Sequence, residues 1–405
     1  MLSKLMRYAR EPLYKNSFFI GLSRVFNAAC GFFFWLVAAR YYSVADVGIA
    51  TALISSLGLV MTFSRFGFDV SLIRFMPLND KNKVFNTCLW ITTLSAIVVS
   101  LIYLMVVGTL SPSISFIQSY AIIFVIFALM NSITLTTGNA FLSFRKGEYY
   151  FTQNLLLASR IPLLLLFAIL GSLGIFFSVG FAYLIASVLA IFLILKFVRI
   201  RPEVSKNFAK KTFKFSSMNY LANVFNVVPS LVLPILVLNL LGAEEAAKYY
   251  IAFAIGNLIL IIPDAISTSF FVEGSHGINL KRGATKALVG IYGLLVPAVL
   301  FIYFFGAFLL GLFGEDYVEA LELLRILAFS SFFVVIYTLF IPVQNIRMRV
   351  ESVVFINLIK FVLLLGLSYV FILRFGIVGV GWAWMITYGI LGLGIVELVK
   401  REQWI

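Results

Sequence analysis

Apolar runs of about 20 residues follow one another along nearly the whole chain, separated by short polar segments. Within these runs, polar and apolar positions do not alternate, so the pattern differs from that of membrane β-strands. Inside a bilayer, a chain must satisfy its backbone hydrogen bonds within helices or a closed barrel. The pattern therefore predicts an all-α polytopic membrane protein.

A hydropathy window of about 19 residues predicts about 12 transmembrane helices, half of them in each half of the chain. The predicted spans are residues 17–39, 47–64, 86–107, 117–138, 153–173, 177–198, 217–241, 247–270, 287–312, 323–345, 352–372 and 376–398.

The longest polar stretch lies midway along the chain, at residues 199–216. Its apolar residues stand among lysines, a pattern typical of an amphipathic segment at a membrane surface. We therefore expect an N-terminal six-helix lobe at 1–198, a cytoplasmic amphipathic linker at 199–216 and a C-terminal six-helix lobe at 217–405.

The two halves share an internal repeat. A shift of 199 positions brings residues 24–27 onto residues 223–226, with the same Val-Phe-Asn triplet in both, and Asp46 onto Glu245. Because six predicted spans separate the copies, both copies have the same orientation in the membrane. The repeat predicts two pseudo-symmetric bundles that face a central cavity.

The composition agrees with a membrane protein: 62% of the residues are hydrophobic, 12% are charged, and the mean hydropathy is +1.05. Soluble domains carry about 25% charged residues. Cys30 and Cys88 both lie in apolar runs, which disfavours a disulfide framework or a metal site. No motif in the sequence predicts a cofactor.

The net charge of +14 is concentrated in alternate loops. Cytoplasmic loops carry the excess of Lys and Arg, so both chain ends are expected in the cytoplasm and the protein in the plasma membrane. The basic face would contact anionic membrane lipid, and nucleic acid is not expected as a partner. The opposite loops hold an acidic cluster at 315–322, which favours the start of a helix.

Three basic residues remain inside predicted spans: Arg24, Arg160 and Lys360. Each costs about 2.5–3.5 kcal/mol at a helix centre, so each needs a reason for its place. Each lies seven or eight residues from the predicted inner end of its span, about 10–12 Å along the helix. Snorkelling to the interface is one explanation. A shared basic cavity for an anionic ligand is the other, and arginine suits phosphate because its planar fork donates two parallel hydrogen bonds.

A few other polar residues also lie within the spans. Asp264 follows Pro263, and it could neutralise an arginine such as Arg24, bind a coupling cation or lie at the inner interface. Four more residues could line a path for sugars or make hydrogen bonds between helices. They are Asn27, Tyr220, Asn223 and Asn226, and the same two roles apply to Asn131.

Several motifs, in order along the chain, resemble those of polysaccharide exporters in the multidrug/oligosaccharidyl-lipid/polysaccharide (MOP) superfamily. They lie at residues 16–19, 38–50, 66–74, 262–266, 314–327 and 376–381. The resemblance implies a flippase that moves a polyprenyl-(di)phosphate-linked oligosaccharide from the inner to the outer leaflet by alternating access, for the synthesis of cell-surface polysaccharide. It also implies a monomer that works beside glycan polymerase or glycosyltransferase partners.

The resemblance implies a basic central cavity as well, in which Arg24 matches the first-helix position and Arg160 and Lys360 match more loosely. Drug exporters of the superfamily that are coupled to cations tend to carry acids in their cavities, and this chain has few, so the coupling ion stays open.

Other functions stay open from the sequence. A cation-coupled drug or metabolite antiporter of the same superfamily would need an acidic pocket, and a lipid II flippase usually has two further spans. A membrane enzyme acting on lipid-linked sugars would need catalytic acids on an outer loop. The only candidates for such acids are Glu244, Glu245 and the cluster at 315–322.

Overall fold

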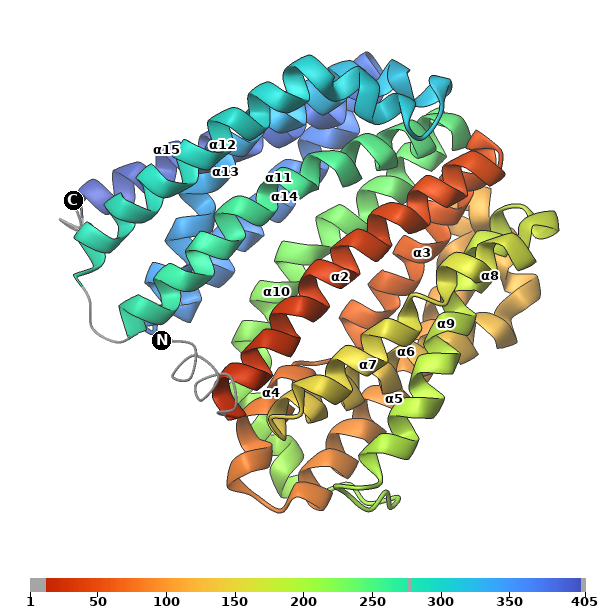
Figure 1. Cartoon of the computed structure of the whole chain (residues 1–405), viewed down its shortest axis with the longest axis vertical. Coiled ribbons are helices and arrows are strands. Elements are labelled where there is room, and N and C mark those ends of the chain that lie inside the picture. Colours follow the sequence, from red (N-terminus) through yellow and green to blue (C-terminus); the bar gives the residue numbers. More distant parts are fainter. Residues whose placement is uncertain (1–11, 276–278, 402–405) are drawn as a thin grey trace, which may run out of the picture. The chain divides into compact units, whose positions relative to one another are not determined.

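The computed structural model describes residues 12–275 and 279–401, and these residues form helices joined by short loops (Figure 1). The α-helices are α2 (Pro12–Tyr41), α3 (Val44–Ser64), α4 (Phe68–Phe75), α5 (Lys81–Leu110), α6 (Ala121–Ser143), α7 (Gly147–Leu157), α8 (Arg160–Leu166), α9 (Ser172–Ile194), α10 (Lys206–Leu241), α11 (Ala243–Ser275), α12 (Leu280–Gly311), α13 (Leu321–Ile346), α14 (Val350–Phe375) and α15 (Val378–Arg401). Short 3₁₀ helices are η1 (Met76–Leu78), η2 (Pro112–Tyr120), η3 (Ala168–Leu170) and η4 (Glu315–Ala320).

Among the described residues, 11 helices are long and apolar enough to cross a membrane. The all-α membrane fold predicted from the sequence is confirmed. The predicted fifth span, 153–173, is broken into α7, α8 and η3. Pro162 explains the break, because its ring clashes with the carbonyl group four residues earlier, at Ala158, where α7 has just ended.

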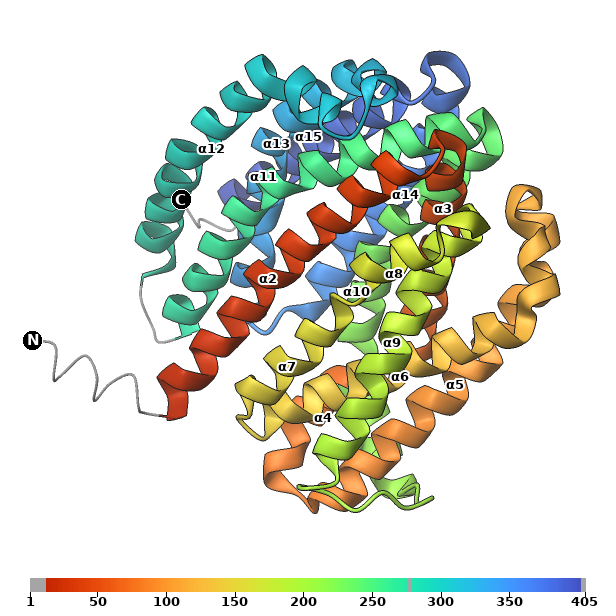
Figure 2. The same ribbon diagram turned by 45° about the vertical axis from the view of Figure 1, so that its right-hand side comes forward.

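The chain divides into two compact units. Unit 1 consists of the chain up to Ser43 together with Leu53–Tyr220, and unit 2 consists of Val44–Ala52 together with Leu221 onward. In unit 1, α2 runs beside α7 and α8 (Figures 1 and 2). In unit 2, α13 packs on both α12 and α15. The division into lobes 1–198 and 217–405 stays a prediction.

The predicted surface linker at 199–216 differs from the structure. Residues 206–216 are the first turns of α10, which continues without interruption to Leu241. Their apolar side packs on α4: the rings of Phe208 and Phe215 lie 5.9 and 5.4 Å from the ring of Phe75. The amphipathic pattern therefore reflects contact with another helix of unit 1.

The internal repeat reappears in the backbone of the two units. The α6–α7 and α13–α14 turns each place one non-glycine residue in the left-handed region, Arg145 (φ 56) and Met348 (φ 59), at an offset of 203. Gly171 and Gly376, offset by 205, share φ values of 56 and 57. Asp80 and Asn279, offset by 199, cap α5 and α12 with side chains that accept hydrogen bonds from the first turn. The sequence repeat thus corresponds to repeated local structure.

Candidate functional site

Arg24, on α2, has an exposed side chain. One turn further along, Asn27 donates a hydrogen bond from Nδ2 to Asn154 Oδ1 of α7, at 2.9 Å. Asn154 in turn donates to the Tyr150 carbonyl oxygen at 2.8 Å. The Asn27 side chain therefore ties α2 to α7, whereas the Arg24 side chain is exposed.

Arg160 begins α8 and packs against α2. Its guanidinium carbon lies 5.1 Å from the centre of the Phe34 ring, a cation–π contact. Phe34 is ten residues beyond Arg24 on α2, a rise of about 15 Å, so the structure does not bring Arg24 and Arg160 together.

The prediction that these two residues share one depth is wrong, because Arg160 lies beside Phe34, well beyond Arg24 along α2. The predicted fifth span begins earlier than expected, with α7 at Gly147, and Arg160 follows the break between α7 and α8. A role for Arg160 in binding an anion stays a prediction.

Lys360 is buried in unit 2, with 4% of its surface exposed. Its ammonium group donates to the Asn226 carbonyl oxygen at 3.0 Å and to Asn226 Oδ1, and it lies 5.1 Å from the centre of the Tyr337 ring. The Tyr337 hydroxyl lies 3.0 Å from Asn226 Oδ1 and 2.6 Å from Asn357 Oδ1. This cluster joins α10, α13 and α14. A role for Lys360 in substrate binding stays a prediction.

The two polar networks occupy equivalent places in the repeat. Asn27 and Asn226 are offset by 199, and their partners Asn154 and Asn357 are offset by 203, as are the turns that precede α7 and α14. Both networks link the first and fifth helical segments of their halves. For Asn27 and Asn226, the structure thus shows hydrogen bonding between helices, one of the two predicted alternatives.

The remaining predicted residues lie on α10 and α11. The hydroxyl of Tyr220, in unit 1, donates to the Phe63 carbonyl oxygen at 3.0 Å. Asn223 and Asp264, in unit 2, both have exposed side chains. The proposed roles of Asp264 and Asn223 stay predictions.

Sequence reasoning missed Asn154, Tyr337 and Asn357. Neutral polar residues within apolar runs give little signal, because they can satisfy themselves on their own helix. The offset of 203 between Asn154 and Asn357 is the signal that could have found them.

Near the start of α11, Lys248 forms an ion pair with Glu245, at 2.9 Å, and another with Glu319 of η4. Glu319, part of the acidic cluster at 315–322, therefore connects η4 to the start of α11. Within residues 12–275 and 279–401, no group of three or more His, Cys, Asp or Glu side chains could hold a metal ion.

The chain shares its fold with several solved membrane transporters. The chain is similar to the lipid II flippase MurJ in an inward closed conformation, with a TM-score of 0.73 and 16% identity over 94% of this chain and 87% of that one. It is also similar to an outward-facing multidrug resistance transporter of the MATE family (0.63, 15%, 94% and 95%). A MOP superfamily transporter from Pyrococcus furiosus, described as having a binding pocket of reversed polarity, is a third (0.60, 14%, 96% and 93%). The fold is that of the MOP superfamily.

The family model described as "Polysaccharide biosynthesis protein" matches residues 13–272, more than half of the chain. The chain belongs to this family. No curated protein matches it in sequence. The family and the membrane helices together identify a multi-pass membrane protein of polysaccharide biosynthesis. The orientation of the chain ends, which lie outside the described residues, stays a prediction.

Proposed function

We propose that this protein is a flippase that moves a polyprenyl-(di)phosphate-linked oligosaccharide from the inner to the outer leaflet, for the synthesis of cell-surface polysaccharide. The observation that carries the proposal is the family match across residues 13–272 in a chain with the MOP transporter fold. Polysaccharide synthesis uses sugars on lipid carriers, and a transporter fold supplies their passage across the bilayer. In this proposal the protein acts as a monomer beside glycan polymerases or glycosyltransferases.

Arg24 is the residue proposed to bind the substrate phosphate. Its guanidinium is exposed on a helix that crosses the membrane, where an unused charge would be costly. An arginine can hold a phosphate with two parallel hydrogen bonds, which lysine cannot reproduce. Alternating access would then carry the bound headgroup and its sugars across while the lipid tail stays in the bilayer.

Depletion of the protein in its own cell separates a flippase from an enzyme. Without a flippase, completed lipid-linked oligosaccharide should accumulate with its sugars on the cytoplasmic side, as measured by lectin access to inverted and right-side-out vesicles. A membrane enzyme would instead leave a truncated or missing oligosaccharide. That outcome would refute the proposal.

The role of Arg24 is tested with Arg24→Ala and Arg24→Lys in proteoliposomes that contain a fluorescent polyprenyl-diphosphate disaccharide. We expect Arg24→Ala to slow flipping at least about tenfold and Arg24→Lys to recover only part of the rate, because lysine lacks the planar fork. Arg40→Ala, at the other end of α2, is the matched control and should flip normally. Normal rates in both Arg24 variants would remove Arg24 from the site without touching the flippase assignment.

A drug or metabolite antiporter is the second candidate, because MATE transporters share the fold. The observation that would favour it is the exposed carboxylate of Asp264 on α11. An antiporter predicts that Asp264→Asn abolishes uptake of cationic dyes driven by an ion gradient. The flippase proposal predicts no such dye transport in the unmodified protein.

A further inference from the structure

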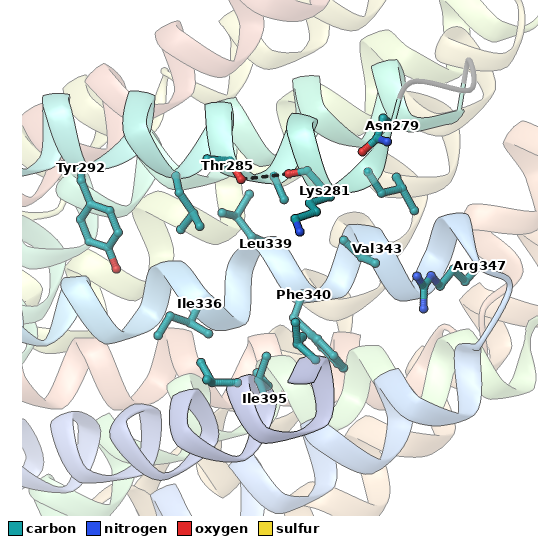
Figure 3. Close-up of a pocket in the computed structure, with 15 residues that line it drawn as sticks. Asn279, Lys281, Thr285, Tyr292, Ile336, Leu339, Phe340, Val343, Arg347 and Ile395 are labelled. Atoms are coloured by element: carbon teal, nitrogen blue, oxygen red, sulfur yellow. Dashed lines mark hydrogen bonds between the residues drawn. The ribbon is translucent and has the colours of Figure 1, made fainter. Parts of the chain in front are cut away.

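A cavity of about 640 Å³ lies between α12, α13 and α15 of unit 2. Its volume falls within the usual range for small-molecule and lipid pockets. Its walls are mostly aliphatic and aromatic except at one end, where Lys281 of α12 and Arg347, directly after α13, contribute basic groups (Figure 3). Among the described residues, none that lines the cavity is acidic. The cavity therefore suits a ligand with an anionic head and an apolar tail.

The length of the cavity matches one leaflet of a bilayer. On α12 the lining runs from Lys281 to Tyr292, and on α13 it runs in the opposite direction, from Arg347 to Ile336. Both stretches rise about 16 Å. Half of the hydrocarbon core is about 15 Å thick. A phospholipid acyl chain reaches this far when its phosphate lies beside the two basic residues.

The internal repeat gives the cavity a counterpart in unit 1, between α5, α6 and α9. The equivalent residues, offset by 199 for α5, 203 for α6 and 205 for α9, belong to a buried apolar cluster there or, for Ile133, pack against it. The equivalent pairs are Phe85 and Ala284, Leu89 and Leu288, Ile133 and Ile336, Ala140 and Val343, and Ile194 and Val399.

In unit 1 the segment that follows α9 fills the space between α5, α6 and α9. After α9, the chain crosses to α5, where Asn86 Nδ2 donates to the Arg199 carbonyl oxygen at 2.9 Å. Phe197 stacks on Phe144, with ring centres 5.3 Å apart, and Val198 is buried in the cluster. Apolar side chains of the chain therefore fill the space in unit 1 that is equivalent to the cavity in unit 2.

We propose that the cavity between α12, α13 and α15 binds an anionic phospholipid from the leaflet at the Lys281 end. The phosphate lies between Lys281 and Arg347, and one acyl chain runs along the apolar wall toward Tyr292. Basic pockets between transmembrane helices bind anionic headgroups in this manner on the cytoplasmic side, where the sequence predicts this end to lie. The site is separate from the proposed role of Arg24, so it does not depend on the flippase assignment.

Native mass spectrometry of the purified full chain tests the proposal, with phosphatidylglycerol and phosphatidylcholine of identical acyl chains as probes. We expect phosphatidylglycerol to be retained about tenfold more strongly at equal concentration, because charged hydrogen bonds hold its head. The double variant Lys281→Ala with Arg347→Ala should lose most of this preference. Lys286→Ala, an exposed lysine on the same helix outside the cavity, should keep it.

Ala284→Phe tests the tail site separately, because it introduces the residue found at the equivalent position in unit 1. It should fill part of the cavity and lower the retention of phosphatidylglycerol without lowering Tm. Equal retention of both lipids by the unmodified protein would overturn the proposal, whatever the variants do.

Two further outcomes identify another occupant and would also overturn the proposal. The first is stronger lipid retention after deletion of residues 402–405, which would assign the cavity to the end of the chain. The second is displacement of phosphatidylglycerol by equimolar polyprenyl phosphate, which would assign the cavity to the transport substrate. We expect neither change.

Discussion

Replacing Gly48 with alanine tests how closely α3 and α11 pack at the start of unit 2. A Cβ at position 48 would lie 1.7 Å from the Ala243 carbonyl oxygen, 2.7 Å from the Ala243 carbonyl carbon and 3.1 Å from the Ala247 nitrogen. All three neighbours are backbone atoms, so rotation of a side chain cannot relieve the clash. The helices would have to separate by roughly 1.5 Å to restore a van der Waals contact.

Such overpacking costs about 1–3 kcal/mol, and Gly48→Ala should lie near the upper end because backbone must move. Helical glycines with open surroundings behave differently: an added Cβ at Gly366 or Gly389 meets no atom within 4 Å. Alanine there should be neutral or stabilise by about 0.5–1 kcal/mol through helix propensity.

The assay is thermal unfolding of the three variants in one detergent, followed by the fluorescence of a thiol-reactive dye and by circular dichroism. Gly48→Ala should lower Tm by several degrees, whereas Gly366→Ala and Gly389→Ala should leave it unchanged or raise it. A Gly48→Ala protein as stable as the Gly366→Ala control would refute the close packing of α3 on α11.

Two further predictions concern the polar networks. A double-mutant cycle with Asn27→Leu and Asn154→Leu, measured by unfolding in detergent, should give a coupling energy of about 0.6–1.7 kcal/mol. Additive effects of the two substitutions would mean that the hydrogen bond from α2 to α7 contributes nothing to stability. Tyr337→Phe should lower the free energy of unfolding by about 1–3 kcal/mol, because it leaves the buried Asn357 oxygen without this donor. Tyr369→Phe, at an exposed position on α14, should leave the free energy of unfolding unchanged.

The helices could be predicted from the sequence because apolar runs of bilayer length leave few alternatives for the backbone. The break in the predicted fifth span could not be predicted from hydropathy, because hydropathy is insensitive to the backbone clash made by Pro162. The first turns of α10 are predicted as a surface linker for a related reason. An amphipathic pattern shows that one side is apolar, and only the structure shows that this side contacts Phe75 of α4.

The candidate site was less predictable than the fold. A charged residue within a span needs a partner or a role, and this predicts Arg24, Arg160 and Lys360 as candidate site residues. Sequence cannot distinguish a cation held by carbonyl groups from one exposed to a ligand. Lys360 donates to Asn226, whereas Arg24 is exposed, although both lie within membrane spans.

Flipping by the purified protein tests the central claim most directly. The protein is reconstituted with a fluorescent polyprenyl-diphosphate oligosaccharide, and a membrane-impermeant reductant bleaches the label on the outer leaflet. If the protein is a flippase, bleaching should proceed from about half of the label in protein-free vesicles to nearly all of it in vesicles that contain protein. Bleaching that stops at the same level in both, with correctly folded protein present, would contradict the account.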